Sequence, residues 1–273
     1  MRRLGSPASA DGKTLATRDL TRTTIDYSVI RRQLTKSADG VSGWLMNPVK
    51  ITGGPVLIFG GSEGGNSLAG AAALLAEHGH PALSLGYFRA DGLPPTLRDV
   101  PLEYFAAAAR LLSPHAPVSV IGYSRGTEAA QLLAENFPGL VRAVVLYAPA
   151  DEVRGSLPSG GDAWLLGGQP VLTTTIPLDR LRAPILTVSG GADGLGGSEA
   201  ASWRIKKRHP STTSLIYPDA GHIVGTFPYD AAGIRDVNPT SHELDQLGGT
   251  RAADAHAQAD SWPKVLAFLA KAT

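Results

Sequence analysis

The sequence has no cysteine among its 273 residues, which excludes disulfide bonds, thiolate metal sites and a cysteine nucleophile. An excess of charge of either sign is also absent, because 25 lysine and arginine residues balance 24 aspartate and glutamate residues. The net charge of +1 argues against nucleic acid and against an anionic membrane surface as partners.

Long apolar runs are missing as well, and no segment approaches the length of a transmembrane helix. Two arginines follow Met1, but no apolar segment comes after them, so we predict no signal peptide. We expect a cytoplasmic protein without a membrane span, and the sequence leaves its oligomeric state open. Nucleotide-binding motifs of the G-K-[ST] and G-x-G-x-x-G types and histidine pairs spaced for a metal are also absent. We therefore expect neither a cofactor nor a metal.

Short apolar segments of strand length alternate with segments of helical periodicity along most of the chain. Such alternation implies βαβ crossovers and a mainly parallel central sheet flanked by helices, an α/β architecture. We expect a mobile leader at 1–24 and a single domain at 25–273, in which 150–181 form a small cap over the sheet edge. The expected strands lie at 27–34, 41–46, 56–59, 81–88, 118–121, 143–147, 184–188 and 213–217. The expected helices lie at 68–75, 102–112, 198–209 and 252–271, and a further helix, with helical spacing from Ala129, runs to about Asn136.

A hairpin is expected between the first two of these strands, because Asp39-Gly40 is a typical turn dipeptide. After the last strand, a long loop is expected to run to about Gly249 before the final helix.

The central motif is G-Y-S-R-G, which follows the apolar segment 118–121 and precedes a helical pattern. Strand, sharp turn and helix with serine at the tip form the G-x-S-x-G nucleophile elbow of α/β-hydrolases. Gly122 and Gly126 are needed because a strained turn leaves no room for a Cβ two positions on either side of Ser124. The motif alone recurs by chance, so the prediction depends on whether the chain supplies partners for this serine.

A serine nucleophile needs a base, usually histidine, and the base needs a carboxylate that orients it. In this fold the order along the chain is serine, acid, histidine. His222 follows the expected strand 213–217 directly and is the predicted base. Three of the other six histidines precede Ser124, and three lie in a charged helix end, the long loop and the last helix; they are His78, His80, His115, His209, His242 and His256.

The predicted acid is Asp193, which follows the expected strand 184–188 after two glycines. This position is one strand–helix unit before the histidine, where the fold places the acid. Asp151 is the alternative, and a helix N-cap is the alternative role for Asp193. Asp219 lies too close to His222 in sequence to reach around it.

An oxyanion hole requires two N–H groups directed at one point. We expect one from Arg125, directly after the nucleophile, and one from the G-G-S-E-G-G loop after the expected strand 56–59. Ser62 is the favoured donor in this loop, and Gly61 is the alternative.

Three further residues are candidates for substrate binding. Glu63 lies in the G-G-S-E-G-G loop, and Tyr123 directly precedes the nucleophile. Trp164 lies in the expected cap, where it either lines an acyl pocket or packs in the core.

Ordered blocks spread over about residues 28–271 resemble one known family. They include V-S-G-W-L-M-N-P, G-G-S-E-G-G, I-G-Y-S-R-G-T-E-A-A, A-P-I-L-T-V-S-G-G-A-D and A-H-A-Q-A-D-S-W-P-K-V-L-A-F-L. The chain is similar to the C-terminal catalytic domain of the acyl-CoA thioesterase / bile-acid-CoA:amino-acid N-acyltransferase family. The resemblance implies an α/β-hydrolase whose nucleophile attacks an acyl thioester, with Ser124, Asp193 and His222 at the triad positions.

The chain departs from the family pattern in two respects. Many members carry a β-sandwich domain before the catalytic domain, whereas only about 25 residues precede the similar region here, so substrate selection by that domain does not carry over. Members that conjugate amino acids typically use cysteine as nucleophile, and the serine here resembles that of the hydrolysing members. An acyl-serine is normally resolved by water, so the resemblance favours hydrolysis over amide synthesis.

Together these observations predict a serine hydrolase that acts on small-molecule acyl thioesters, either acyl-CoA or an acylated carrier. Three alternatives remain: a carboxylesterase or lactone hydrolase with the same triad, an acyltransferase with an amine or alcohol acceptor, and a non-catalytic binding protein of hydrolase fold. The acyl chain is not determined by the sequence.

Overall fold

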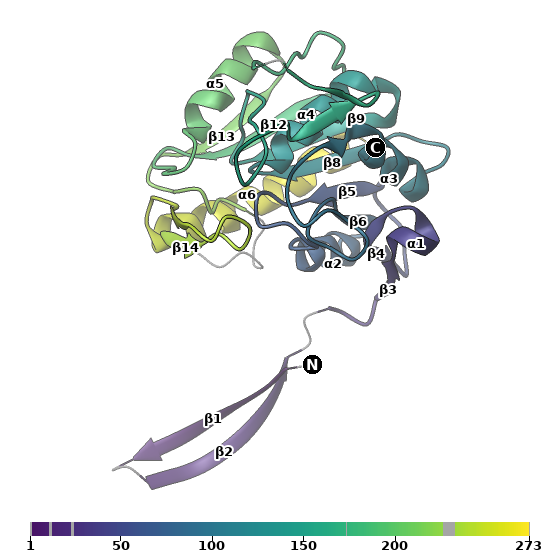
Figure 1. Ribbon diagram of the computed structural model, residues 1–273. Helices are drawn as coiled ribbons and strands as arrows, with labels where there is room; N and C mark the ends of the chain where they lie inside the picture. Colours follow the sequence, from purple (N-terminus) through teal and green to yellow (C-terminus); the bar gives the residue numbers. More distant parts are fainter. Residues whose placement is uncertain (1, 11–12, 23–24, 173, 226–232, 273) are drawn as a thin grey trace.

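The fold is built on an eight-stranded sheet (Figure 1). The structure is a computed structural model, which describes residues 2–10, 13–22, 25–172, 174–225 and 233–272. The strand order is β13-β12-β9-β8-β5-β6-β4-β3. Six strands from β6 to β13 are parallel, whereas β4 is antiparallel to both of its neighbours. The strands are β3 (Val29–Leu34), β4 (Ser42–Pro48), β5 (Val56–Phe59), β6 (Ala82–Gly86), β8 (Val118–Tyr123), β9 (Val141–Tyr147), β12 (Ile185–Gly190) and β13 (Thr213–Tyr217).

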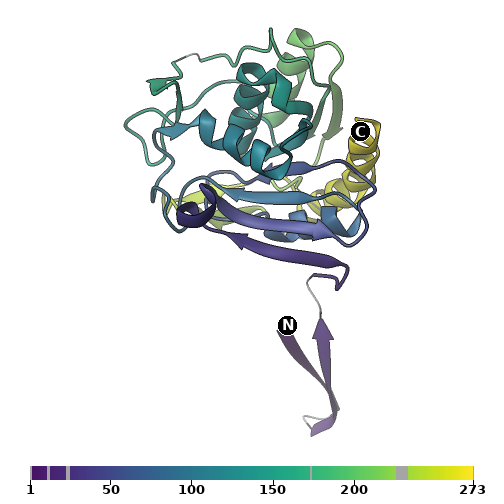
Figure 2. The same cartoon turned by 90° about the vertical axis from the view of Figure 1, so that its right-hand side faces the viewer.

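Helices cover both faces of this sheet, as Figures 1 and 2 show. Helices α2 (Ala69–Glu77) and α6 (Arg251–Lys271) contribute to the apolar core on one face, and α3 (Leu102–Leu112), α4 (Gly126–Asn136) and α5 (Ser198–Arg208) to that on the other. The predicted α/β-hydrolase fold is therefore confirmed, and each of the eight sheet strands overlaps an apolar segment predicted from the sequence.

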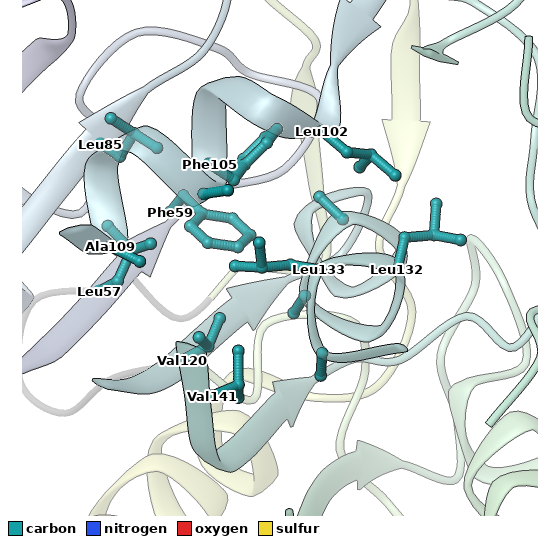
Figure 3. Packing of buried hydrophobic residues seen from close by; sticks show 14 of the residues in the cluster. Leu57, Phe59, Leu85, Leu102, Phe105, Ala109, Val120, Leu132, Leu133 and Val141 are labelled. Carbon is teal, nitrogen blue, oxygen red and sulfur yellow. The ribbon is translucent and has the colours of Figure 1, made fainter. Parts of the chain in front are cut away.

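The two cores follow from the pleat of the strands, because successive side chains point to opposite faces of a sheet. In β5, Leu57 and Phe59 enter the core beneath α3 and α4, whereas Val56 and Ile58 enter the core beneath α2 and α6. Figure 3 shows Phe59 packed against Phe105 of α3, with ring centroids 4.9 Å apart. Truncating a fully buried phenylalanine to alanine typically costs about 3–5 kcal/mol, so this layer fixes the position of β5 and of the loop that follows it.

The connection between β3 and β4 is helical, although the Asp39-Gly40 dipeptide predicts a hairpin turn. The strands form the expected antiparallel pair, but a single helical turn, α1 (Lys36–Asp39), joins them. Thr35 caps this turn by accepting a hydrogen bond from the Ala38 N–H, and Gly40 ends it with φ = 75°. The Asp-Gly dipeptide therefore marks a helix C-terminus here, where glycine adopts the same left-handed conformation.

Smaller sheets lie outside the central one. Strands β1 (Arg2–Ala10) and β2 (Lys13–Arg22) pair as a hairpin that lies apart from the domain in both views (Figures 1 and 2). Residues 1, 11–12 and 23–24 of the expected leader are outside the described part.

Within the expected cap, β10 (Trp164–Leu166) pairs with β11 (Gln169–Pro170) and with β7 (Val100–Pro101). In the expected long loop, residues 226–232 are outside the described part, and β14 (Arg235–Val237) and β15 (Leu244–Gln246) form a hairpin that the sequence did not predict.

Candidate active site

Ser124 occupies the sharp turn between β8 and α4 with φ = 51°, a conformation that few residues other than glycine adopt. The flanking glycines are required by sterics. A Cβ on Gly122 would meet the Gly126 carbonyl oxygen at 2.5 Å, and a Cβ on Gly126 would clash with the Gly60 carbonyl oxygen. The turn therefore has the geometry of a nucleophile elbow, with the serine at its tip.

The His222 ring lies within hydrogen-bonding distance of this serine, with 2.9 Å between Nε2 and Ser124 Oγ. His222 follows β13, and contacts from two other segments hold its backbone. Its N–H donates to the Leu247 carbonyl at 2.8 Å, and the Tyr123 hydroxyl donates to its carbonyl oxygen at 2.8 Å. Because Tyr123 is adjacent to Ser124, this second bond ties the histidine loop directly to the elbow.

The Asp193 carboxylate lies on the other side of the ring, with both oxygens 3.0 Å from His222 Nδ1. Its Oδ1 also accepts from the N–H groups of Leu195 and Gly196, at 2.9 and 3.3 Å. Burial acts to raise the pKa of Asp193, but the hydrogen bond and charge of His222 and the N–H donors outweigh it and bring the pKa to about 2. Asp193 is therefore ionised at neutral pH and holds the Nδ1 proton, which leaves Nε2 free to accept a proton from Ser124.

The alternative acid, Asp151, lies elsewhere and is engaged by two arginines. Arg204 Nη2 is 2.7 Å from its Oδ1, and Arg208 Nη2 is 3.1 Å from its Oδ2. The structure thus brings Ser124, His222 and Asp193 together from three different strand ends and leaves Asp151 outside the group.

Two backbone N–H groups beside the serine have no hydrogen-bond partner within the described residues, those of Arg125 and Ser62. The N–H of Gly61 is engaged, because it lies 3.0 Å from each carboxylate oxygen of Glu63. Of the two oxyanion donors that the sequence left open in this loop, Ser62 is therefore the one whose N–H is available.

The loop after β5 is held from below by Tyr87, whose side chain is fully buried. Its hydroxyl lies 2.9 Å from the carbonyl oxygens of both Gly60 and Gly61. Burial raises the pKa of Tyr87 well above its ordinary value, so the hydroxyl remains a proton donor to these carbonyls. The loop is thus fixed from the core side, and its N–H groups remain on the side of the cleft.

An open cleft of about 260 Å³ leads to Ser124, and Glu63 and Tyr123, two of the residues predicted to bind substrate, line it. Its apolar part is formed by Leu68, Tyr123, Leu195, Ile223, Val237, Pro239 and Leu247. A second, more polar arm of about 180 Å³ extends from Ser124 past Arg125, Arg154, Ser241 and Glu243. The cleft thus offers a more apolar and a more polar binding region, both of which reach the serine.

Trp164, the third predicted substrate-binding residue, is not in this cleft. Its side chain is fully buried, and its ring packs against Tyr87 and Phe105. Its Nε1 donates to Glu128 at 2.8 Å. Of the two roles that the sequence left open for Trp164, the structure shows core packing.

Several residues at the site were not singled out from the sequence. Asn238, Leu247 and Asp245 line the cleft and come from the segment around the unpredicted β14–β15 hairpin. Nothing in their spacing distinguishes them from an exposed loop, so only the folded structure identifies them.

Among the described residues, no group of three or more histidine, aspartate or glutamate side chains could hold a metal ion. The helices of the described segments include none that is long and apolar enough to cross a membrane.

Comparison with known proteins finds a family and several relatives that are similar to this chain. Residues 166–273 match the family described as BAAT / Acyl-CoA thioester hydrolase C terminal. The chain is 30% identical to mouse acyl-coenzyme A thioesterase 6 over 233 residues, which are 73% of this chain and 55% of the relative. This chain is a homologue of the acyl-CoA thioesterases. The resemblance found in the sequence is thereby confirmed, and the matched region includes Asp193 and His222.

Two other relatives are named for different reactions, one as a thioesterase and one as an N-acyltransferase. Human acyl-coenzyme A thioesterase 6 is 27% identical over 80% of this chain and 59% of its own length. Mouse acyl-coenzyme A amino acid N-acyltransferase 1 is 27% identical over 73% of this chain and 55% of its own length. The chain thus spans little more than half the length of these curated relatives.

Solved structures of α/β-hydrolases share the fold. A dienelactone hydrolase-like promiscuous phosphotriesterase from metagenomic libraries matches with a TM-score of 0.59 and 17% identity, over 89% of this chain and 98% of its own. A dienelactone hydrolase-like protein from Klebsiella pneumoniae matches with a TM-score of 0.56 at 17% identity and the same coverage. At this identity the likeness shows the fold alone.

Proposed function

We propose that this protein is a serine hydrolase that cleaves acyl thioesters, such as acyl-CoA or an acylated carrier, through an acyl-serine intermediate. The observation that supports the proposal most strongly is the continuous chain of contacts from Ser124 Oγ through the His222 ring to the Asp193 carboxylate. The homology to acyl-CoA thioesterases supports the choice of a thioester as the bond that is cleaved.

In the first half of the reaction, His222 Nε2 takes the Ser124 hydroxyl proton as Oγ attacks the acyl carbonyl carbon. The negative charge on the carbonyl oxygen is stabilised by the N–H groups of Arg125 and Ser62. When the tetrahedral intermediate collapses, the carbon–sulfur bond breaks and the thiolate takes the proton from His222. Asp193 orients the ring and stabilises the imidazolium that forms between these two transfers.

In the second half, water takes the place of the thiol. His222 removes a proton from water, the resulting hydroxide attacks the acyl-serine carbonyl, and Ser124 Oγ leaves with the proton from His222. The free carboxylic acid and the regenerated serine result. The apolar arm of the cleft fits the acyl chain, and the polar arm beyond Arg154 fits the carrier.

Transfer to an amine is the second candidate, because one homologue is an acyl-coenzyme A amino acid N-acyltransferase. The open cleft at Ser124 favours water as the acceptor. An enzyme that forms amides has to protect its acyl intermediate from hydrolysis, and an open cleft does not exclude water.

The test is a panel of acyl-CoA, acyl-pantetheine and p-nitrophenyl ester substrates, each with and without glycine or taurine as an acceptor. Release of free thiol and free acid, unaffected by the amine, is the expected result. The Ser124→Ala variant should lose roughly 10³-fold or more in kcat. Wild-type-like turnover by that variant, or an amide as the main product, contradicts the proposal.

A fluorophosphonate probe separates an enzyme from a binding protein of the same fold. Ser124 Oγ should displace fluoride from phosphorus, with the serine proton passing to His222, and leave a covalent adduct on the peptide that contains Ser124. The Ser124→Ala variant is the control. Absence of an adduct on the wild-type protein favours a non-catalytic role.

A further inference from the structure

Asn238 lines the cleft that leads to Ser124, although it belongs to a segment far from the nucleophile in sequence. It follows β14 directly, and it lines both the apolar and the polar arm. Its side chain is buried, with the residue 8% exposed. A buried amide at a point where two binding regions meet calls for an explanation, because desolvated amides are costly unless they are fully hydrogen-bonded.

The Asn238 amide uses its full bonding capacity in this position. Its Oδ1 accepts from the N–H groups of Thr240 and Ser241, at 2.9 and 3.1 Å, which closes the turn between β14 and β15. Its Nδ2 donates to Asp245 Oδ2 at 3.1 Å and to Ser62 Oγ at 2.8 Å. The contact with Ser62 joins two segments 176 residues apart.

Ser62 is the residue whose backbone N–H is available beside the nucleophile. The loop that contains it is fixed at Gly60 and Gly61 by the Tyr87 hydroxyl, but that contact ends one residue earlier. The bond from Asn238 is the one hydrogen bond of the Ser62 side chain within the described residues. Asn238 therefore limits the rotation of Ser62 and with it the direction of the Ser62 N–H.

We propose that Asn238 is a positioning residue for the oxyanion hole, which holds Ser62 so that its N–H points at the developing oxyanion. The proposal rests on the proposed function, since it assigns a role within the same reaction. Asp245 contributes by accepting the second Nδ2 proton, which fixes the plane of the amide. The hairpin thus acts on the chemistry without contacting the reacting atoms.

A residue that positions an oxyanion donor acts more strongly on the transition state than on the bound substrate. Removal of the Asn238 donor should therefore lower kcat by about tenfold and leave KM nearly unchanged, less than the 10²–10³-fold typical of losing the donor itself. A residue that merely shapes the pocket would change KM instead.

The experiment compares Asn238→Ala with Ser62→Ala, which keeps the backbone N–H but removes the Oγ acceptor. Ser62→Ala leaves the bonds from Thr240 and Ser241 to Asn238 in place, so it separates positioning from folding of the turn. Gln246→Ala is the matched control, because Gln246 is exposed on β15 of the same hairpin and lines neither arm. Melting temperature is recorded for each variant.

We expect Asn238→Ala and Ser62→Ala each to lower kcat by about tenfold and the double variant Asn238→Ala/Ser62→Ala to lower it no further, because both changes break the same contact. Additive losses, or an unchanged kcat with a raised KM, overturn the proposal. Gln246→Ala should behave as the wild type.

The rate of fluorophosphonate labelling at Ser124 gives a second measurement that does not depend on the natural substrate, because the phosphonyl oxygen occupies the oxyanion position. Asn238→Ala should slow this labelling by about tenfold. If the wild type labels but hydrolyses no thioester, the substrate assignment fails and the role of Asn238 is still decided by this rate. Labelling as fast as in the wild type overturns the role.

Discussion

The indole Nε1 of Trp164 donates a 2.8 Å hydrogen bond to Oε2 of Glu128, and both side chains are fully buried. Glu128 lies in the first turn of α4, directly after the nucleophile elbow, and its Oε1 is 2.7 Å from Arg125 Nε. Burial raises the pKa of Glu128, while Arg125 and Trp164 act to lower it. This carboxylate ties the elbow helix to the cap region and keeps Arg125 in place.

Replacement of Trp164 by phenylalanine tests this structural role. The ring still fills the aromatic layer, but the bond to Glu128 is lost, so the free energy of unfolding should fall by about 1.5–3 kcal/mol, as for hydrogen bonds to charged groups. KM should not change, because Trp164 does not line the cleft. Urea unfolding and steady-state kinetics measure both quantities. A raised KM with unchanged stability would instead make Trp164 a pocket residue.

A methyl group added at Gly126 should destroy the elbow. In the folded chain it would clash with the Gly60 carbonyl oxygen, which belongs to the loop after β5 and cannot move without displacing Tyr87. We expect Gly126→Ala to lose at least 10²-fold in kcat/KM and to unfold at lower temperature. Gly139→Ala is the control, since a Cβ there meets no atom within 4 Å. Equal activity of the two variants would contradict this account.

The low pKa of Asp193 predicts a specific dependence of stability on pH. A folded pKa of about 2 against 3.8 for the free group means that ionised Asp193 stabilises the fold above pH 3.8. This contribution, about 2 kcal/mol, is lost as the pH falls towards 2. The difference in unfolding free energy between the wild type and Asp193→Asn should therefore shrink between pH 6 and pH 3. A difference that stays constant as the pH falls towards 2 would contradict the low pKa of Asp193.

Asp254 of α6 is a fully buried carboxylate behind the histidine loop, and its Oδ1 accepts from the Gly221 N–H at 2.7 Å. One turn later, Gln258 Nε2 donates to the Ile223 carbonyl at 2.9 Å, so α6 holds the backbone on both sides of His222. Asp254→Ala should lower the unfolding free energy by about 1–3 kcal/mol, because the Gly221 N–H is left without its acceptor. It should also lower kcat, because the backbone beside His222 is less well held. A wild-type kcat for this variant would show that α6 does not position the base.

Asp254→Asn separates the charge of this residue from its hydrogen bond. Burial and the charge of Asp193 raise the pKa of Asp254, although the Gly221 N–H acts to lower it. A raised pKa means that ionisation costs folding free energy as the pH rises above the unfolded value. Asp254→Asn should therefore gain stability relative to the wild type between pH 4 and pH 7, measured by urea unfolding. A constant difference across this range contradicts the raised pKa.

The sequence predicted the parts of the site that depend on chain order. Ser124, Asp193 and His222 each follow an apolar segment, and parallel strands bring their carboxyl ends to one edge, so their proximity follows from topology. The choice between Ser62 and Gly61 required the structure, because it depends on the Glu63 carboxylate that engages the Gly61 N–H.

Contacts between distant segments could not be predicted in this way. The bond between Asn238 and Ser62 and the burial of Trp164 against Glu128 depend on how irregular segments fold back over the sheet. Such segments carry no periodicity from which their partners follow. The same reason explains the unpredicted hairpin β14–β15, whose two strands have only three residues each.

The bond from Tyr123 to the His222 carbonyl has a consequence for the newly made chain. The ribosome makes Ser124 98 residues before His222, and α6, which contributes two of the hydrogen bonds that hold the His222 loop, is made later still. An emerging chain would therefore carry its nucleophile for much of its synthesis without a base to activate it. Under the proposed mechanism, Ser124 therefore gains its base only late in the synthesis of the chain.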